Sequence, residues 1–190
     1  MKRVIFLFAT ITLMVAAAYS QVAVGSKIDN FSVPDTDGKM RSLEDVRGKN
    51  GAVLIFISAE CPVVRGYDQR MNELSKAYKA KGINVIGIDS NVTESLDQVK
   101  THAATTWDFP VLIDKGFVVA DKLGANVTPE AYYLDANNVL LYHGAIDNDR
   151  SGRNVTERFL QTAFESALAG KKIERSSANA FGCSIKRAVE

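Results

Sequence analysis

Two strongly apolar segments, separated by one amphipathic segment, constrain the fold of this 190-residue chain more than any other feature. Residues 52–58 and 83–89 each have the length of one strand and an almost unbroken apolar character, which is typical of strands buried on both faces. Residues 62–81 lie between them with apolar side chains at helical spacing, and Gly82 ends that segment. The order strand, helix, strand predicts a parallel unit at the centre of a sheet.

The segments that follow extend this unit into one domain. We expect a helix at 93–104, a strand at 110–114, a short helix at 117–123, a hairpin with strands at 131–135 and 139–143, and a final helix at 156–169. This order predicts an α/β fold with a central mixed β-sheet and helices on both faces. We place the domain at residues 21–170 and expect residues 171–190, which carry Cys183, to form an irregular tail.

The first twenty residues have the pattern of a secretory signal. Lys2 and Arg3 precede an uncharged apolar stretch at 4–18, and small residues stand before Gln21 at the positions that a signal peptidase needs. The alternative is an uncleaved membrane anchor, but about 15 apolar residues fall short of the roughly 20 that span a bilayer. We therefore expect cleavage after Ser20 and an exported protein with no membrane attachment, in a compartment where disulfides persist.

Composition excludes several function classes. Removing Lys2 and Arg3 leaves 21 cations against 22 acids, a net charge of −1, so there is no basic excess for a nucleic acid partner. Two cysteines rule out a disulfide-dense scaffold and a Cys-only zinc site, and two distant histidines leave little for another metal site. We expect neither a metal nor a cofactor.

Cys61 is the most informative single residue. It follows the first buried strand directly and precedes Pro62, which is favoured at the first position of a helix. Unpaired N–H groups there would favour a thiolate by about 1–2 kcal/mol, which raises the thiolate fraction at pH 7 from about 3% to about a quarter. Arg65, one turn later, would add to this effect. The position suits a nucleophile; the alternatives are a buried inert cysteine or half of a structural disulfide.

Two motifs resemble one known family. Residues 56–65, Phe-Ile-Ser-Ala-Glu-Cys-Pro-Val-Val-Arg, resemble the active-site turn of the thioredoxin-like redoxins of the alkyl hydroperoxide reductase/thiol-specific antioxidant group. Residues 127–135 resemble the same family's Thr-Pro segment, which implies that Pro129 is cis and faces Cys61. Asn91, residues 142–147 and residues 182–186 resemble a secreted branch of that family. The resemblance implies a thioredoxin-like fold, with Cys61 as the reactive thiol.

The sequence departs from two patterns known in such proteins. A dithiol reductase carries Cys-x-x-Cys, but Val64 stands at the second cysteine's place, so a local disulfide cycle is impossible. A typical peroxiredoxin has Pro seven and Thr three residues before its reactive cysteine, where this chain has Leu54 and Ser58. Ser58 can supply a hydroxyl, but the missing proline leaves peroxide chemistry as one candidate among others.

Cys183 is the only other cysteine, and the sequence leaves two roles open for it: a resolving thiol or a structural partner. A Cys61–Cys183 bridge would close a loop of about 120 residues, which is worth about 4–5 kcal/mol in the chain-entropy model. We predict that oxidation joins Cys61 to Cys183, within one chain or across a dimer. Within one chain, the tail must fold back over the start of the first long helix, because bridged Cα atoms lie within about 7 Å.

The function that we expect is that of a thiol-based oxidoreductase with antioxidant activity. Cys61 would attack a peroxide or a protein or small-molecule disulfide, and an external thiol would restore the enzyme. We expect the substrate to contact Ser58, Pro62, Arg65, Thr128 and Pro129. The alternative is a non-catalytic binding or assembly module with a structural Cys61–Cys183 disulfide. A metallochaperone role is disfavoured, because the Cys-x-x-x-Cys that it needs has Arg65 at its second cysteine's place.

Several polar residues are expected to have no part in the chemistry. His143 and Asp147 are expected to be exposed hairpin residues, the alternative being that they flank the site, and His102 is expected to be solvated on a helix. Asn91, Asn126 and Asn154 each begin an Asn-Val-Thr triplet that matches the glycosylation pattern, and we interpret these matches as chance.

Overall fold

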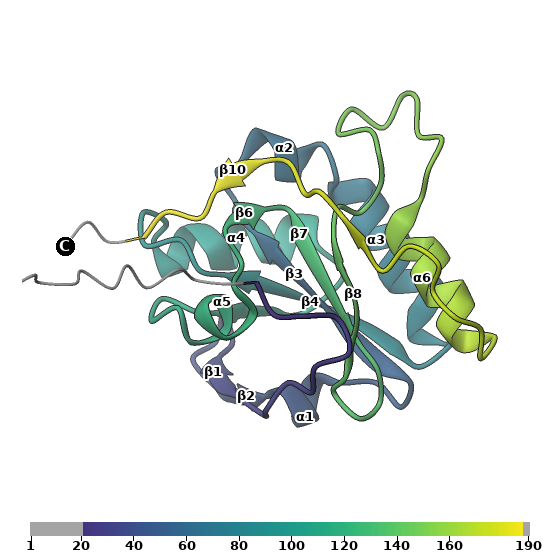
Figure 1. Cartoon of the computed structure of the whole chain (residues 1–190). Helices are drawn as coiled ribbons and strands as arrows, with labels where there is room; N and C mark the ends of the chain where they lie inside the picture. The colour runs from purple at the N-terminus through teal and green to yellow at the C-terminus, as the bar shows by residue number, and fades with distance from the viewer. Residues whose placement is uncertain (1–20, 188–190) are drawn as a thin grey trace, which may run out of the picture.

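A six-stranded mixed sheet lies at the centre of the computed structural model, which describes residues 21–187 (Figure 1). The expected secretion signal at residues 1–20 lies outside the described residues. Within 21–187, no helix combines the length and the apolar character that crossing a bilayer requires.

The strand order is β5-β4-β3-β7-β8-β9. The strands are β3 (Gly51–Ile57), β4 (Ile83–Asp89), β5 (Val111–Ile113), β7 (Glu130–Leu134), β8 (Leu140–Gly144) and β9 (Ser177–Ala178). The β3–β4 and β4–β5 pairs are parallel, β7 is antiparallel to both β3 and β8, and β9 is parallel to β8. Two smaller ladders pair β1 (Ser32–Pro34) with β2 (Met40–Ser42) and β6 (Val127–Thr128) with β10 (Cys183–Ser184). The predicted mixed sheet is confirmed.

Helices cover both faces of this sheet, as predicted. They are α1 (Leu43–Val46), α2 (Pro62–Arg65), α3 (Asp68–Lys79), α4 (Leu96–Thr106), α5 (Val118–Leu123) and α6 (Phe159–Leu168). Apolar side chains of α3, α4 and α6 pack on one face, and those of α1 and α5 pack on the other. Ile55 and Ile57 of β3 point to the first face while Leu54 and Phe56 point to the second, and all four are fully buried. Burial on both faces explains why residues 52–58 carry no charge.

The single long helix expected at 62–81 is wrong, because the chain breaks into α2 and α3 at Gly66 and Tyr67. The carbonyl oxygen of Arg150 lies only 2.9 Å from where a side chain on residue 66 would begin, so only glycine fits beneath that loop. Tyr67 is 1% exposed and its hydroxyl donates to Asp147 at 3.0 Å. The break therefore turns Tyr67 inward, to a buried acceptor.

The next helix also begins later than predicted. The sequence indicated a start at Thr93, whereas α4 starts at Leu96 with Ser95 as its N-cap. The Ser95 hydroxyl accepts from the Gln98 N–H, and the Gln98 side chain accepts from the Ser95 N–H, which is a complete capping box. This reciprocal pair fixes the first turn of the helix.

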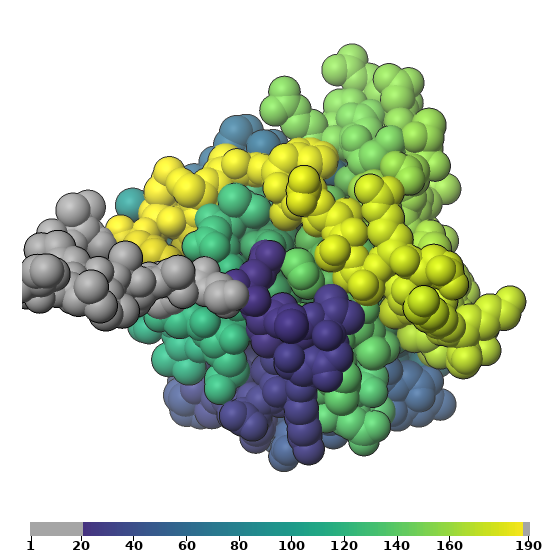
Figure 2. All heavy atoms as spheres, viewed as in Figure 1, coloured from purple at the N-terminus to yellow at the C-terminus, as the bar shows by residue number. Residues whose placement is uncertain are grey.

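The tail is largely irregular, as expected, but it also contributes two short strands that were not predicted, β9 to the central sheet and β10 to the β6 ladder. From the end of α6 it runs back across the molecule to β6 and α2 (Figure 1). Figure 2 shows the tail, in yellow, lying along the molecular surface rather than projecting from it. The glycine at position 144 allows β9 to lie this close to β8. A Cβ on Gly144, at φ +127°, would collide with the carbonyl oxygen of Ala178.

We predict that Gly144→Ala lowers the free energy of unfolding by at least about 3 kcal/mol, because strain at positive φ is added to the collision with β9. Gly170 is the matched control, since it also has a positive φ (+65°) but open space around it. Gly170→Ala should cost about 1 kcal/mol, from backbone strain alone. Urea denaturation of both variants checks this, and equal losses would contradict the close packing of β9 on β8.

Candidate active site

Cys61 lies at the turn between β3 and α2, at the N-cap of the helix. Its N–H lies 3.1 Å from the Ser58 hydroxyl oxygen, and its side chain is 2% exposed. A disulfide joins Cys61 to Cys183, with the Cα atoms 6.1 Å apart. The pairing that we expected on oxidation is therefore present within one chain, and it places the tail over the start of α2.

Thr128, which directly precedes Pro129, faces this disulfide from the neighbouring segment. The Thr128–Pro129 peptide bond is cis, as the resemblance implied, and the Thr128 carbonyl oxygen lies 3.4 Å from the Cys61 sulfur. Cys183 is the register partner of Thr128 in the β6–β10 ladder, and the Thr128 hydroxyl donates to the Cys183 carbonyl at 3.4 Å. The two cysteines thus meet beside the Thr-Pro turn.

Glu94 is a site residue that sequence reasoning missed. Its carboxylate accepts hydrogen bonds from the Ser58 hydroxyl and, at 2.9 Å, from the Ala59 N–H, and it is 3% exposed. A signal was available, because Glu94 follows β4, and the carboxyl ends of neighbouring parallel strands lie at one edge of a sheet. Glu94 therefore fixes the turn that carries Cys61.

The same contact limits what Ser58 can do. Its hydroxyl has one proton, which goes to Glu94, while its oxygen accepts from the Cys61 N–H. In this arrangement Ser58 has no proton to donate to a substrate at the Cys61 sulfur. Ser58 supports the turn.

The other expected substrate contacts differ in exposure. Pro62 and Arg65 are exposed beside Cys61, whereas Thr128 and Pro129 are buried. The Arg65 guanidinium donates to the Ala59 carbonyl at 3.0 and 3.2 Å, so it is held on the active-site turn. Pro62 and Arg65 are thus the members of this set that a partner molecule can contact directly.

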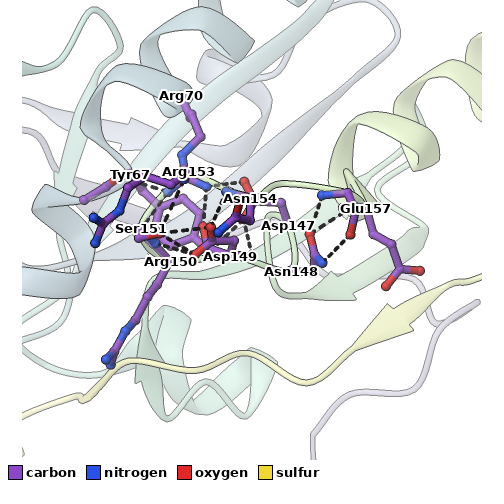
Figure 3. A network of polar contacts seen from close by, with 12 residues as sticks. Tyr67, Arg70, Asp147, Asn148, Asp149, Arg150, Ser151, Arg153, Asn154 and Glu157 are labelled. Atoms are coloured by element: carbon purple, nitrogen blue, oxygen red, sulfur yellow. Dashed lines mark hydrogen bonds and ion pairs between the residues drawn. The ribbon is translucent and has the colours of Figure 1, made fainter.

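The expectation that Asp147 is an exposed hairpin residue is wrong. Asp147 is 3% exposed, accepts from the Tyr67 hydroxyl at 3.0 Å and forms an ion pair with Arg70 (Figure 3). Burial, with the nearby Asp147 carboxylate, raises the pKa of Tyr67, so the phenol stays a proton donor. This network ties the residue at the α2–α3 break to the loop after β8, and its role is structural.

Both histidines are also less exposed than expected. His143 is half-buried and stacks on Tyr132 with ring centres 5.9 Å apart, and burial lowers its pKa. His102 is half-buried with its ring edge-on to Trp107 at 4.6 Å. Each ring completes an aromatic cluster rather than facing solvent.

The three Asn-Val-Thr triplets lie in different environments. Asn91 is 1% exposed and its amide nitrogen donates to the Ile57 carbonyl at 3.1 Å, so it cannot carry a glycan in the folded protein. Asn126 and Asn154 are exposed.

Two large cavities of the molecule lie away from the disulfide. Cavities of about 680 and 630 Å³ lie elsewhere, the first between α3, α6 and the loop after β8 and the second beside β8 and the end of α6; neither is lined by Cys61 or Cys183. Among residues 21–187, no three side chains of the metal-binding types cluster as a metal site would require. The reactive atoms that the structure brings together at this site are the sulfur atoms of Cys61 and Cys183.

Comparison with known proteins agrees with this geometry. The model of the AhpC/TSA family matches residues 24–143, a range that contains Cys61 and Pro129 and ends before Cys183. The chain belongs to the AhpC/TSA family. The resemblance noted in the sequence is therefore confirmed at the level of the family.

Curated relatives of this AhpC/TSA protein include thiol-disulfide oxidoreductase ResA from Bacillus thuringiensis strain Al Hakam, 33% identical over 116 residues. That match covers 60% of this chain and 65% of the relative, so the chain spans just under two thirds of the relative's length. ResA from Halalkalibacterium halodurans is 28% identical over 148 residues, which are 77% of this chain and 78% of the relative.

Solved structures support the same fold. A hypothetical protein from Sinorhizobium meliloti 1021 has a TM-score of 0.82 at 28% identity, covering 90% of this chain and 98% of its own. A putative thiol:disulfide interchange protein DsbE from Chlorobium tepidum has a TM-score of 0.65 at 21% identity, covering 78% of this chain and 99% of its own. The second likeness shows the thioredoxin-like fold alone.

We predict that Glu94→Ala lowers the free energy of unfolding by about 2–4 kcal/mol, because two buried donors lose their acceptor. The reduced variant should also show a changed rate of Cys61 alkylation, since the turn is no longer fixed. Glu60→Ala is the matched control, because Glu60 is exposed in the same turn, and it should stay within about 0.5 kcal/mol of the wild type. Similar effects of the two substitutions would contradict the role of Glu94.

The loop shown in Figure 3 contains a strongly hydrogen-bonded carboxylate, that of Asp149. The Asn154 and Ser151 N–H groups donate to the Asp149 carboxylate at 2.6 and 2.8 Å and lower its pKa to about 2. A depressed carboxyl pKa stabilises the fold above the unfolded value, 3.8, and this contribution is lost as the pH falls through about 2.

We therefore expect the Ser151 and Asn154 amide resonances to shift in one step near pH 2, and expect Asp149→Asn to remove that step. A step near pH 4, or one that persists in the variant, would contradict this account of the loop.

Proposed function

We propose that this protein is a thiol-disulfide oxidoreductase whose redox couple is Cys61 and Cys183. The observation that carries the proposal is the disulfide between them, formed at the Cys-Pro turn of an AhpC/TSA family member and beside Pro129. The names of the relatives, thiol-disulfide oxidoreductase and thiol:disulfide interchange protein, support the same reaction class. Export fits this chemistry, since disulfides persist outside the reducing cytosol.

The proposed cycle begins with the reduced protein. Without the S–S bond, the Cys183 side chain turns away and uncovers the Cys61 thiolate, which attacks one sulfur of a substrate disulfide and expels the other as a thiolate. The Cys183 thiolate then attacks the Cys61 sulfur of the mixed disulfide and releases the second substrate thiol. The substrate disulfide gains two electrons, and the protein leaves with the Cys61–Cys183 bond.

An external thiol restores the dithiol. Cys183 is half-buried, whereas Cys61 is 2% exposed beneath the tail, so the reductant attacks Cys183 and Cys61 leaves as the thiolate. A second molecule of the reductant resolves the mixed disulfide on Cys183, and the reductant departs as its own disulfide.

The substrate class that we favour is a disulfide presented on a polypeptide surface. Neither cysteine lines the two large cavities, and the residues beside Cys61 that a partner can contact, Pro62 and Arg65, are exposed. Antioxidant activity through peroxide reduction is less favoured, because the proton of the Ser58 hydroxyl is directed at Glu94.

A structural disulfide is the second candidate role for the cysteine pair. The bond closes a loop with a sequence separation of 122 and anchors the tail. Such a long loop would stabilise the fold by about 5 kcal/mol in the chain-entropy model. In that case the domain would act as a binding or assembly module without turnover.

We predict that Cys61→Ser abolishes reduction of insulin disulfides by dithiothreitol-recycled protein, because the attacking sulfur is absent. Cys183→Ser is the matched control: it keeps the first attack but cannot resolve it, so one equivalent of substrate should remain attached to Cys61 when the reduced variant meets insulin in the absence of dithiothreitol. Turnover and non-reducing mass spectrometry measure the two outcomes, with hydrogen peroxide as a parallel oxidant. Full activity in Cys61→Ser would overturn the proposal.

A further inference from the structure

The tail contacts the rest of the protein on both sides of Cys183. After Cys183, Ile185 is 7% exposed within the apolar cluster on the α5 face, and its N–H donates to the Asn126 carbonyl at 2.9 Å. Before Cys183, the Ala145 N–H donates to the carbonyl of Ala178 in β9 at 3.1 Å. None of these contacts involves a sulfur atom.

Asn91 joins the tail to the segment that carries Cys61. Its amide nitrogen donates to the carbonyl of Ile57, the last residue of β3, at 3.1 Å. Its amide oxygen accepts from the Lys186 N–H at 3.0 Å, and the N–H of the next residue, Val92, donates to the Lys186 carbonyl at 2.9 Å. One buried side chain therefore connects the end of the strand before Cys61 with the backbone after Cys183.

Gly182 shows how closely the tail is fitted here. A Cβ on this residue would collide with the Thr128 carbonyl, the group that also faces the Cys61 sulfur. The backbone next to Cys183 thus packs against the Thr-Pro turn, where only glycine allows such an approach. This contact is made by backbone atoms and not by a sulfur atom.

We propose that Asn91 and Ile185 are positioning residues that keep the backbone of the tail docked beside Cys61 in the reduced protein, so that the Cys183 side chain can turn away from Cys61 and return to it. The inference rests on the proposed function and concerns its second step, in which the Cys183 thiolate attacks the Cys61 sulfur of a mixed disulfide. The Cys61–Cys183 bond forms, the bond to the substrate breaks, and the electron pair leaves on the substrate sulfur. A tail docked by Asn91 and Ile185 gives Cys183 a high effective concentration at that sulfur.

The equilibrium with glutathione measures this effective concentration. Full-length reduced protein is mixed with oxidised and reduced glutathione, and the Cys61–Cys183 oxidation constant is read from the thiol and disulfide fractions. Asn91→Ala and Ile185→Ala should each lower this constant about tenfold or more, since each removes a buried contact that orders the tail. Phe181→Ala is the matched control on the same tail, 37% exposed, and should leave the constant within about twofold.

This constant separates positioning from general stability. Substitution of a purely structural residue would lower the stability of the dithiol and disulfide forms alike, so the oxidation constant would not change. An unchanged oxidation constant in both Asn91→Ala and Ile185→Ala would therefore overturn the proposal. Should Asn91→Ala fail to fold, Ile185→Ala and hydrogen exchange of the reduced wild type decide the matter. Slow exchange of the Ile185 and Lys186 amides supports the proposal, and exchange at the rate of an unfolded chain overturns it.

The glutathione experiment can succeed or fail independently of the proposed function. The glutathione equilibrium needs no protein substrate, so a chain that fails to reduce insulin can still show the predicted loss in the two variants. Equally, a chain that reduces insulin through Cys61 can show no loss, which would leave the function intact and remove the positioning role.

Discussion

Parallel pairing of β3 with β4 is the constraint on which the site depends. Its register sets Ile57 opposite Asp89, so the turns that follow both strands begin at one edge of the sheet. One turn carries Cys61, and the other carries Asn91 and Glu94, whose carboxylate fixes the first turn. Antiparallel pairing would have sent these two segments to opposite ends of the sheet.

The C-terminal tail supplies the second cysteine of the site. Val64 stands where a second cysteine would give a local dithiol, so the partner sulfur must come from elsewhere in the chain. Cys183 supplies it from a segment that pairs with β6 and is tied to Asn91. A long-range contact thereby replaces a motif that other redoxins hold within one helical turn, and its geometry depends on how the tail docks.

Local patterns predicted the centre of this fold well. The apolar runs identified β3 and β4, because buried strands are specified by adjacent residues, and the resemblance to the redoxins implied that the Thr-Pro segment lies opposite Cys61. The β9 and β10 strands of the tail could not be predicted, since two-residue strands have no periodicity. Asp147 was placed wrongly for a similar reason: its burial depends on Tyr67 and Arg70, which are distant in sequence. Glu94 was missed because its partners also lie far along the chain.

The reduction potential of the Cys61–Cys183 bond shows most directly whether this bond is a working redox couple. Equilibration of the full-length protein with dithiothreitol or glutathione buffers, read by thiol trapping, gives the value. We predict a potential between about −270 and −120 mV, the range of thiol-disulfide oxidoreductases, with full recovery over repeated cycles. A potential below about −300 mV, where structural disulfides of secreted proteins lie, would contradict the account.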